Sequence, residues 1–148
     1  MSEHNWPWRI LLVEDNPADE KMVRKCIRKH EIKCDLFVLD DGLQAMEYLD
    51  ELDSNARSPA PDLVLLDISL PHHDGLEILR RLRASERCGQ TPVIMMTASG
   101  SPEKYEESIK NASSHYFQKQ ADYEAFLKLG NIIKKTLETE SINYRKKT

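Results

Sequence analysis

The chain has 148 residues, of which 40% are hydrophobic and 31% are charged, and its net charge is −4. That length suits one hydrophobic core, so we expect a single domain over residues 1–148 rather than a sensor joined to an effector. The mild acidity argues against nucleic-acid binding as the main function, and no apolar run is long enough to span a membrane. Cys26, Cys34 and Cys88 match no zinc or redox-pair spacing, which favours reduced thiols in a cytoplasmic protein.

Short apolar runs alternate with longer amphipathic segments along the chain. Uninterrupted apolar runs of this length are typical of strands that are covered on both faces, as in a parallel sheet. The runs predict five strands, at residues 10–13, 36–39, 63–66, 93–96 and, more weakly, 116–117.

The segments between these runs carry helical signals. Asn16 followed by Pro17 predicts the start of the first helix, and Asp19 and Glu20 suit its first turn. Residues 102–111 hold only two large apolar side chains, so we expect a loosely held fourth helix there. The other helices are predicted by apolar stripes: Met22, Val23, Cys26 and Ile27; Leu43, Met46, Leu49 and Leu52; Leu76, Ile78, Leu79 and Leu82; and Phe126, Leu129, Ile133 and Leu137. Five strands alternating with five helices predict an α/β fold with a doubly wound parallel sheet.

Polar side chains that carry chemistry follow four of the five predicted strands. In an open parallel sheet, ligands bind at the carboxyl ends of the strands, so these side chains should converge on one edge. Singly, each has an ordinary explanation, such as an acid at a helix N-terminus or a solvated lysine. Their shared position at strand ends favours a functional site made of Glu14 and Asp15, Asp67, Thr97 and Lys119.

The chemistry of this set predicts a divalent cation and a phosphoryl group. Three carboxylates at one edge repel each other unless a cation neutralises them, and all-oxygen ligation suits Mg²⁺ or Mn²⁺. The lysine ammonium and the threonine hydroxyl suit the equatorial oxygens of a phosphoryl group. A carboxylate can itself be the nucleophile and form an aspartyl phosphate.

Four motifs carry a resemblance to the receiver domains of two-component response regulators, and among these to the phytochrome-associated single-domain response regulators. They are ILLVEDN at 10–16, LLDISLP at 65–71 with Asp74 and Gly75, MTA at 96–98 and YFQK at 116–119. The resemblance covers residues 8–137 and leaves 138–148 as a short polar tail. It implies a flavodoxin-like receiver fold with strand order 2-1-3-4-5, and a stand-alone regulator that signals by docking to other proteins.

The resemblance also implies a role for each site residue. Asp67 accepts the phosphoryl group, and its neighbours fall into three sets that overlap. The metal ligands are Glu14, Asp15, Asp67 and the backbone carbonyl of Ser69; the phosphoryl contacts are Thr97, Ala98 and Lys119; and the switch pair is Thr97 and Tyr116.

The partners that the resemblance implies are proteins. A sensor histidine kinase, of the phytochrome type in this subgroup, is the expected phosphoryl donor. Related receivers often form homodimers through the face that corresponds to residues 102–137, and the last predicted helix offers an apolar stripe for such a dimer. Neither nucleic acid nor a membrane is an expected partner.

Two departures from the usual receiver pattern have consequences. Most receivers have proline after the lysine, often with a cis bond, whereas here Gln120 follows Lys119. A cis bond before a residue other than proline costs about 2.5–4 kcal/mol, so we expect a trans bond. Ser69 and Ser99 stand beside the expected entry of hydrolytic water and are poor at orienting it, which predicts slow autodephosphorylation.

Two other functions stay open at this point. A haloacid-dehalogenase-type phosphatase also uses an aspartate nucleophile and Mg²⁺, but it needs a second aspartate where this chain has Ser69, and its cap domain would not fit the length. A pseudo-receiver, an interaction module that takes no phosphate, is the second alternative. The intact set of site residues argues against it.

Overall fold

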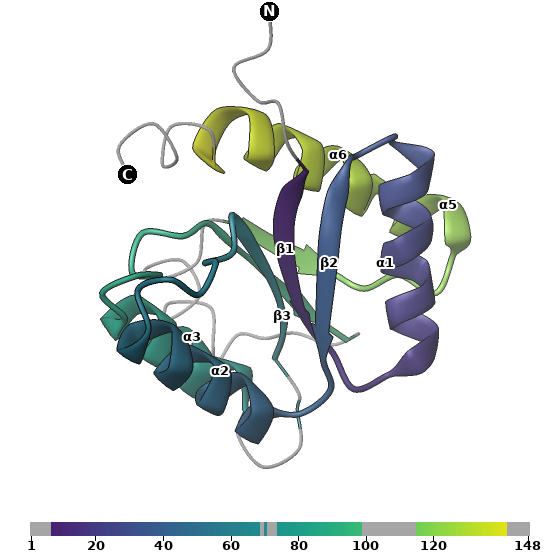
Figure 1. Cartoon of the computed structure of the whole chain (residues 1–148). Helices are drawn as coiled ribbons and strands as arrows, with labels where there is room; N and C mark the ends of the chain where they lie inside the picture. Colours follow the sequence, from purple (N-terminus) through teal and green to yellow (C-terminus); the bar gives the residue numbers. More distant parts are fainter. Residues whose placement is uncertain (1–6, 69, 71–73, 99–114, 142–148) are drawn as a thin grey trace, which may run out of the picture.

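The computed structural model describes residues 7–68, 70, 74–98 and 115–141 of the chain (Figure 1). All strand pairs in it are parallel, and the sheet has the order β2-β1-β3-β4-β5. The predicted doubly wound sheet and its strand order are therefore confirmed. The strands are β1 (Trp8–Val13), β2 (Cys34–Leu39), β3 (Leu63–Asp67), β4 (Val93–Thr97) and β5 (His115–Gln118).

Helices cover both faces of this sheet. Figure 1 shows α1, α5 and α6 on one face and α2 and α3 on the other. Their bounds are α1 (Pro17–Lys29), α2 (Gly42–Ser54), α3 (Gly75–Ala84), α5 (Tyr123–Phe126) and α6 (Lys128–Thr136). The fourth helix predicted within 102–111 lies outside the described residues.

The core has two halves because successive strand residues point to opposite faces. On β1, Ile10 and Leu12 pack toward α1 and α6, while Leu11 and Val13 pack toward α2 and α3. The same alternation continues along β3 and β4, whose residues are all buried. Apolar runs without alternation therefore predicted the three central strands correctly, since both of their faces are covered.

Two parts of the sequence-based core are exposed in the structure. β2 is an edge strand, and Phe37 at its middle is 48% exposed, so the expectation that this strand is covered on both faces is wrong. Leu43 is 47% exposed, and the buried stripe of α2 instead follows Ala45, Leu49 and Leu52. Leu43 lies two residues before Ala45, which places it on roughly the opposite side of the helix from the buried stripe.

The C-terminal helix differs from the single stretch predicted to Leu137. It is divided at Leu127 between α5 and α6, and a π-helical turn continues it over Leu137–Ser141. Ser141 is fully buried, and its hydroxyl donates a hydrogen bond of 2.8 Å to the carbonyl oxygen of Asp62. Packed structure therefore includes Ser141, the fourth residue of the segment predicted to be the tail.

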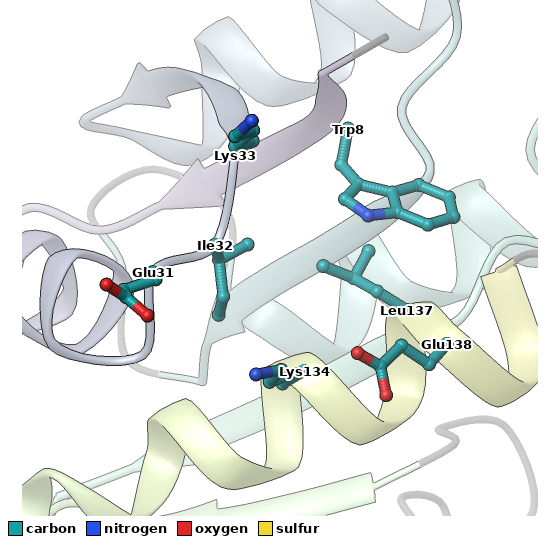
Figure 2. Close-up of a pocket in the computed structure, with 7 residues that line it drawn as sticks. All are labelled: Trp8, Glu31, Ile32, Lys33, Lys134, Leu137 and Glu138. Carbon is teal, nitrogen blue, oxygen red and sulfur yellow. The ribbon is translucent and has the colours of Figure 1, made fainter. Parts of the chain in front are cut away.

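A shallow pocket of about 110 Å³ opens beside the first residue of β1 (Figure 2). Trp8, Ile32 and Leu137 form its apolar part, and Lys134 and Glu138 line it from the C-terminal helix. Trp8 is the first residue of β1, whereas Glu14 and Asp15 follow its last residue. The pocket therefore lies at the amino ends of the strands, opposite the predicted site. Among the described residues, no helix is long and apolar enough to cross a membrane.

Candidate functional site

The carboxyl ends of the strands bring the predicted polar residues together. Asp67 is the last residue of β3 and Thr97 the last of β4, and both are 3% exposed. Glu14, directly after β1, is 1% exposed, and its amide donates to the carbonyl of Leu39 at 2.9 Å. The amide of Lys119 donates to the carbonyl of Thr97 at 2.7 Å, which fixes the backbone that follows β5.

The connection from β3 to α3 holds the backbone at Asp67 in place. Asp74 caps α3 by accepting a hydrogen bond of 3.0 Å from the amide of Glu77. The amide of Gly75 donates to the carbonyl of Ile68 at 2.8 Å, and a Cβ at Gly75 would lie 2.6 Å from the Cα of Ile68. Glycine is therefore required for this close approach of α3 to the end of β3.

The ammonium of Lys119 lies among three carboxylates. Its Nζ is 2.8 Å from Glu14 Oε1, 2.8 Å from Asp19 Oδ2 and 3.0 Å from Asp67 Oδ2. The lysine side chain is 10% exposed, so water screens these contacts only weakly. One positive charge thus faces three acidic groups in a largely buried place.

The pKa values of Glu14 and Lys119 reflect this crowding. Burial, with the nearby Asp67 carboxyl, raises the pKa of Glu14 to about 8, although Lys119 acts in the opposite direction. Burial alone would lower the pKa of Lys119, but the contacts with Asp19 and Glu14 outweigh it and raise this pKa above its ordinary value. The acidic groups are therefore incompletely neutralised by the lysine.

Three of the carboxylates have the geometry for a divalent cation. One oxygen from each of Glu14, Asp15 and Asp67 lies within 4.8 Å of the other two. Opposite ligands of an octahedral Mg²⁺ at ~2.1 Å lie ~4.2 Å apart, so small side-chain shifts suffice to bind it. Asp15 is exposed while the other two are buried, so the three residues that would hold a cation lie at the rim of the site. Mg²⁺ and Mn²⁺ both fit this donor set.

A hydrogen bond links the predicted switch pair. Thr97 Oγ1 and Tyr116 Oη lie 3.0 Å apart, and either can be the donor. Tyr116 is 38% exposed and lies on β5, the second edge strand. The bond therefore connects a buried site residue to the surface of the molecule. Ala98, a predicted phosphoryl contact, directly follows Thr97 and is exposed.

Two of the predictions concern the loops around the site. The described backbone contains no cis peptide bond, so the bond between Lys119 and Gln120 is trans, as expected. Ser69, the predicted fourth metal ligand, and Ser99 lie outside the described residues.

The sequence interpretation missed Asp19. It treated this residue only as an acid in the first turn of α1, whereas Asp19 contacts Lys119 across 100 positions of sequence. Asn16 caps α1 by accepting hydrogen bonds from the amides of Ala18 and Asp19. Asp19 therefore lies in the turn nearest the strand ends. Its place in the first turn of the helix that directly follows the acidic end of β1 was the available signal.

Comparison with known families decides the class of this protein. The model of the response regulator receiver domain matches residues 10–130. This chain belongs to the receiver-domain family of response regulators. The family transmits signals, and the four resemblance motifs fall within the matched span.

The most similar relatives and structures include phytochrome-associated regulators. The response regulator Rcp1 of Synechocystis is 39% identical over 97 residues, which are 66% of this chain and 66% of Rcp1. Phosphorylated RcpA, a cyanobacterial phytochrome response regulator, matches with a TM-score of 0.77 and 26% identity, covering 90% of this chain and 95% of RcpA. The Mn²⁺-bound form of Rcp1 matches with a TM-score of 0.75 and 32% identity, covering 86% and 92% of the two chains.

Proposed function

We propose that Asp67 accepts a phosphoryl group from the phosphohistidine of a sensor kinase in a Mg²⁺-dependent reaction. The observation that carries the proposal is the position of Asp67 itself. This buried carboxylate is at the end of a central strand and lies 3.0 Å from the Lys119 ammonium. With Glu14 and Asp15 it forms a group of carboxylates close enough together to bind one divalent cation. Membership in a signalling family agrees with a phosphoacceptor and gives no support to a hydrolase.

The chain's own residues would divide the work of the transfer. A carboxylate oxygen of Asp67 attacks phosphorus, the new O–P bond forms as the P–N bond to the kinase histidine breaks, and the histidine leaves with that electron pair. Lys119 orients and neutralises the phosphoryl oxygens, and Thr97 and the backbone at Ala98 donate hydrogen bonds to them. Glu14 and Asp15, together with Asp67, would hold the divalent cation, which would supply further positive charge to the transferring group.

Phosphorylation would reach the surface through the switch pair. If the Thr97 hydroxyl turns toward the phosphoryl group, it breaks the 3.0 Å hydrogen bond that it makes with Tyr116 Oη in the unphosphorylated structure. Tyr116 then repacks at the edge strand β5. The result is a shift between two populated arrangements of a docking surface rather than a new fold.

The partners follow from the relatives and stay part of the proposal. A phytochrome-type histidine kinase is favoured because phytochrome response regulators are among the similar structures. Docking takes place on the face that includes β5 and α6, which also offers the surface for a homodimer over residues 102–137. The chain's mild acidity favours protein rather than nucleic acid as the target.

Acetyl phosphate with Mg²⁺ tests the proposal without a kinase. We expect the wild type to be labelled and the Asp67→Asn variant to stay unlabelled. Asp40→Asn is the matched control, because Asp40 follows the end of β2 but does not belong to the cation-binding set of Glu14, Asp15 and Asp67. It should label like the wild type. Equal labelling of Asp67→Asn would overturn the proposal, and an unlabelled wild type that ignores beryllofluoride would favour the pseudo-receiver.

The lifetime of the label is a second outcome of the same experiment. Because serine at positions 69 and 99 orients water poorly, the phosphoryl group should persist for many minutes in purified protein. A half-life of seconds would contradict that prediction. Turnover of p-nitrophenyl phosphate by the wild type would instead indicate the phosphatase.

A further inference from the structure

The position of Asp19 raises a question about charge that the proposed function leaves open. Lys119 now faces Glu14 and Asp67, which are two of the three residues that fit a divalent cation. A cation bound there takes oxygens from the ammonium and repels it at short range. Without another anionic partner, the lysine would either compete with the metal or swing away from Asp67.

Asp19 supplies that partner from outside the metal-binding set. Its Oδ2 lies 2.8 Å from Lys119 Nζ, as close as the nearest oxygen of Glu14. The Asp19 side chain is 23% exposed, so its pairing with the lysine carries only a modest desolvation cost. The first turn of a helix capped by Asn16 fixes the backbone of Asp19, so the carboxylate is presented without a flexible loop.

We propose that Asp19 is a positioning residue that holds the Lys119 ammonium beside Asp67 while a divalent cation occupies Glu14, Asp15 and Asp67. This inference rests on the proposed function, in which Lys119 and the cation act on the same phosphoryl group. Asp19 contacts Lys119 at 2.8 Å but belongs neither to the set that would hold the cation nor to the expected phosphoryl contacts, so it acts only through the lysine. It lets two cations share one acidic site.

The test is a double-mutant cycle on Mg²⁺ affinity, measured by NMR titration of the unphosphorylated protein with MgCl₂. Asp19→Asn keeps the shape of the side chain and removes its charge. In this variant the lysine has only Glu14 and Asp67 as anionic partners, so it competes more strongly and the Kd for Mg²⁺ should rise roughly three- to tenfold. In a Lys119→Gln background no ammonium competes, and the Asp19→Asn change should then alter the Kd by less than about twofold.

A matched control separates this effect from a general loss of negative charge. Glu20→Gln removes the same charge from the same helical turn, but Glu20 pairs with Arg24 at 3.1 Å and makes no hydrogen bond or ion pair with a described residue of the site. Its Kd for Mg²⁺ should match the wild type. An equal rise of the Kd with Asp19→Asn in both backgrounds would overturn the proposal, because Asp19 would then act directly on the metal. No rise in either background would overturn it as well.

A second readout follows the lysine rather than the metal. In Mg²⁺-saturated wild type, the ¹⁵Nζ signal of Lys119 should be protected from solvent exchange, and Asp19→Asn should remove this protection. Neither readout needs phosphorylation. If Asp67 is not labelled but the effect of Asp19→Asn on the Kd depends on Lys119, the result counts against the proposed function alone. If Asp67 is labelled but Asp19→Asn does not change the Kd, the result counts against the role of Asp19 alone.

Discussion

Two polar clusters of this molecule use similar residues in opposite ways. The acidic site places Glu14, Asp19 and Asp67 around a single lysine. The second cluster, the helix clasp, joins α2 to α3: Asp53 accepts hydrogen bonds from Ser85 Oγ at 2.6 Å and from Arg81 at 2.9 Å. In the clasp one carboxylate has several donors, whereas in the site several carboxylates share one donor.

The pKa shifts record this difference. The hydrogen bond from Ser85, helped by Arg81, lowers the pKa of Asp53, whereas burial raises the pKa of Glu14 to about 8. A lowered carboxyl pKa means that the charged form is stabilised by folding, and a raised one means the reverse. The clasp is therefore complete as it stands, while the site holds excess negative charge that a further cation can neutralise.

The largest expected effect is a loss of stability with rising pH, the opposite of what a carboxyl group with a lowered pKa causes. Between the ordinary value of 4.5 and about 8, the folded protein binds more protons at Glu14 than the unfolded chain does. The free energy of unfolding of the metal-free protein should therefore fall by several kcal/mol as the pH rises through this window. Urea denaturation in EDTA at several pH values measures it.

Two additions sharpen this first prediction. Saturating Mg²⁺ should restore stability at pH 8, because it binds the deprotonated carboxylates of the folded state. Glu14→Gln, which mimics the neutral carboxyl, should flatten the slope in EDTA. A slope that survives unchanged in Glu14→Gln would show that another group causes it.

The clasp should respond to mutation in the opposite sense. Asp53→Ala leaves Ser85 and Arg81 without their shared acceptor, so the free energy of unfolding at pH 7 should fall by about 1–2 kcal/mol. Because the pKa of Asp53 is lowered, its contribution is present above about pH 4 and is lost as the pH falls further. In urea denaturation, the free energy of unfolding of the variant should therefore fall less steeply than that of the wild type as the pH drops below about 4.

Asp50 provides the control for the clasp. It pairs with the same Arg81 at 2.9 Å, but its side chain is 71% exposed, so solvent screens the pair. Asp50→Ala should change stability much less than Asp53→Ala. Equal losses from both variants would mean that the clasp is an ordinary surface ion-pair network.

The smallest effect concerns the link between the acidic site and the surface. Tyr116→Phe removes the hydrogen bond to Thr97 and should lower the free energy of unfolding by about 0.5 kcal/mol, since Tyr116 is 38% exposed. The Kd for Mg²⁺ should stay the same. Tyr123→Phe, at an exposed tyrosine of α5, is the control and should change neither quantity. A shifted Kd in Tyr116→Phe would show that the switch pair and the metal site are coupled before phosphorylation.

The central strands and the residues at their ends could be predicted from sequence because burial on both faces leaves uninterrupted apolar runs. The position directly after such a run lies at the carboxyl end of the strand, where ligands bind in parallel sheets. This rule led to Asp67 and Thr97, which the structure places at the ends of β3 and β4. Edge strands and helix rotation carry weaker signals, so Phe37 and Leu43 were predicted to be buried and are exposed.

Asp19 shows the limit of this approach. Its type and place suit an ordinary acid in a first helical turn, and its contact with Lys119 depends on the distance between α1 and the end of β5. Tertiary packing alone sets that distance. The same holds for the buried hydroxyl of Ser141, which lies in a segment predicted to be a polar tail.

Phosphotransfer from a purified, radiolabelled sensor histidine kinase tests the central claim most directly. With Mg²⁺ present, label should pass to the wild type and to Asp40→Asn but not to Asp67→Asn, and EDTA should stop the transfer. Label that still reaches Asp67→Asn would contradict the assignment of Asp67 as the phosphoacceptor.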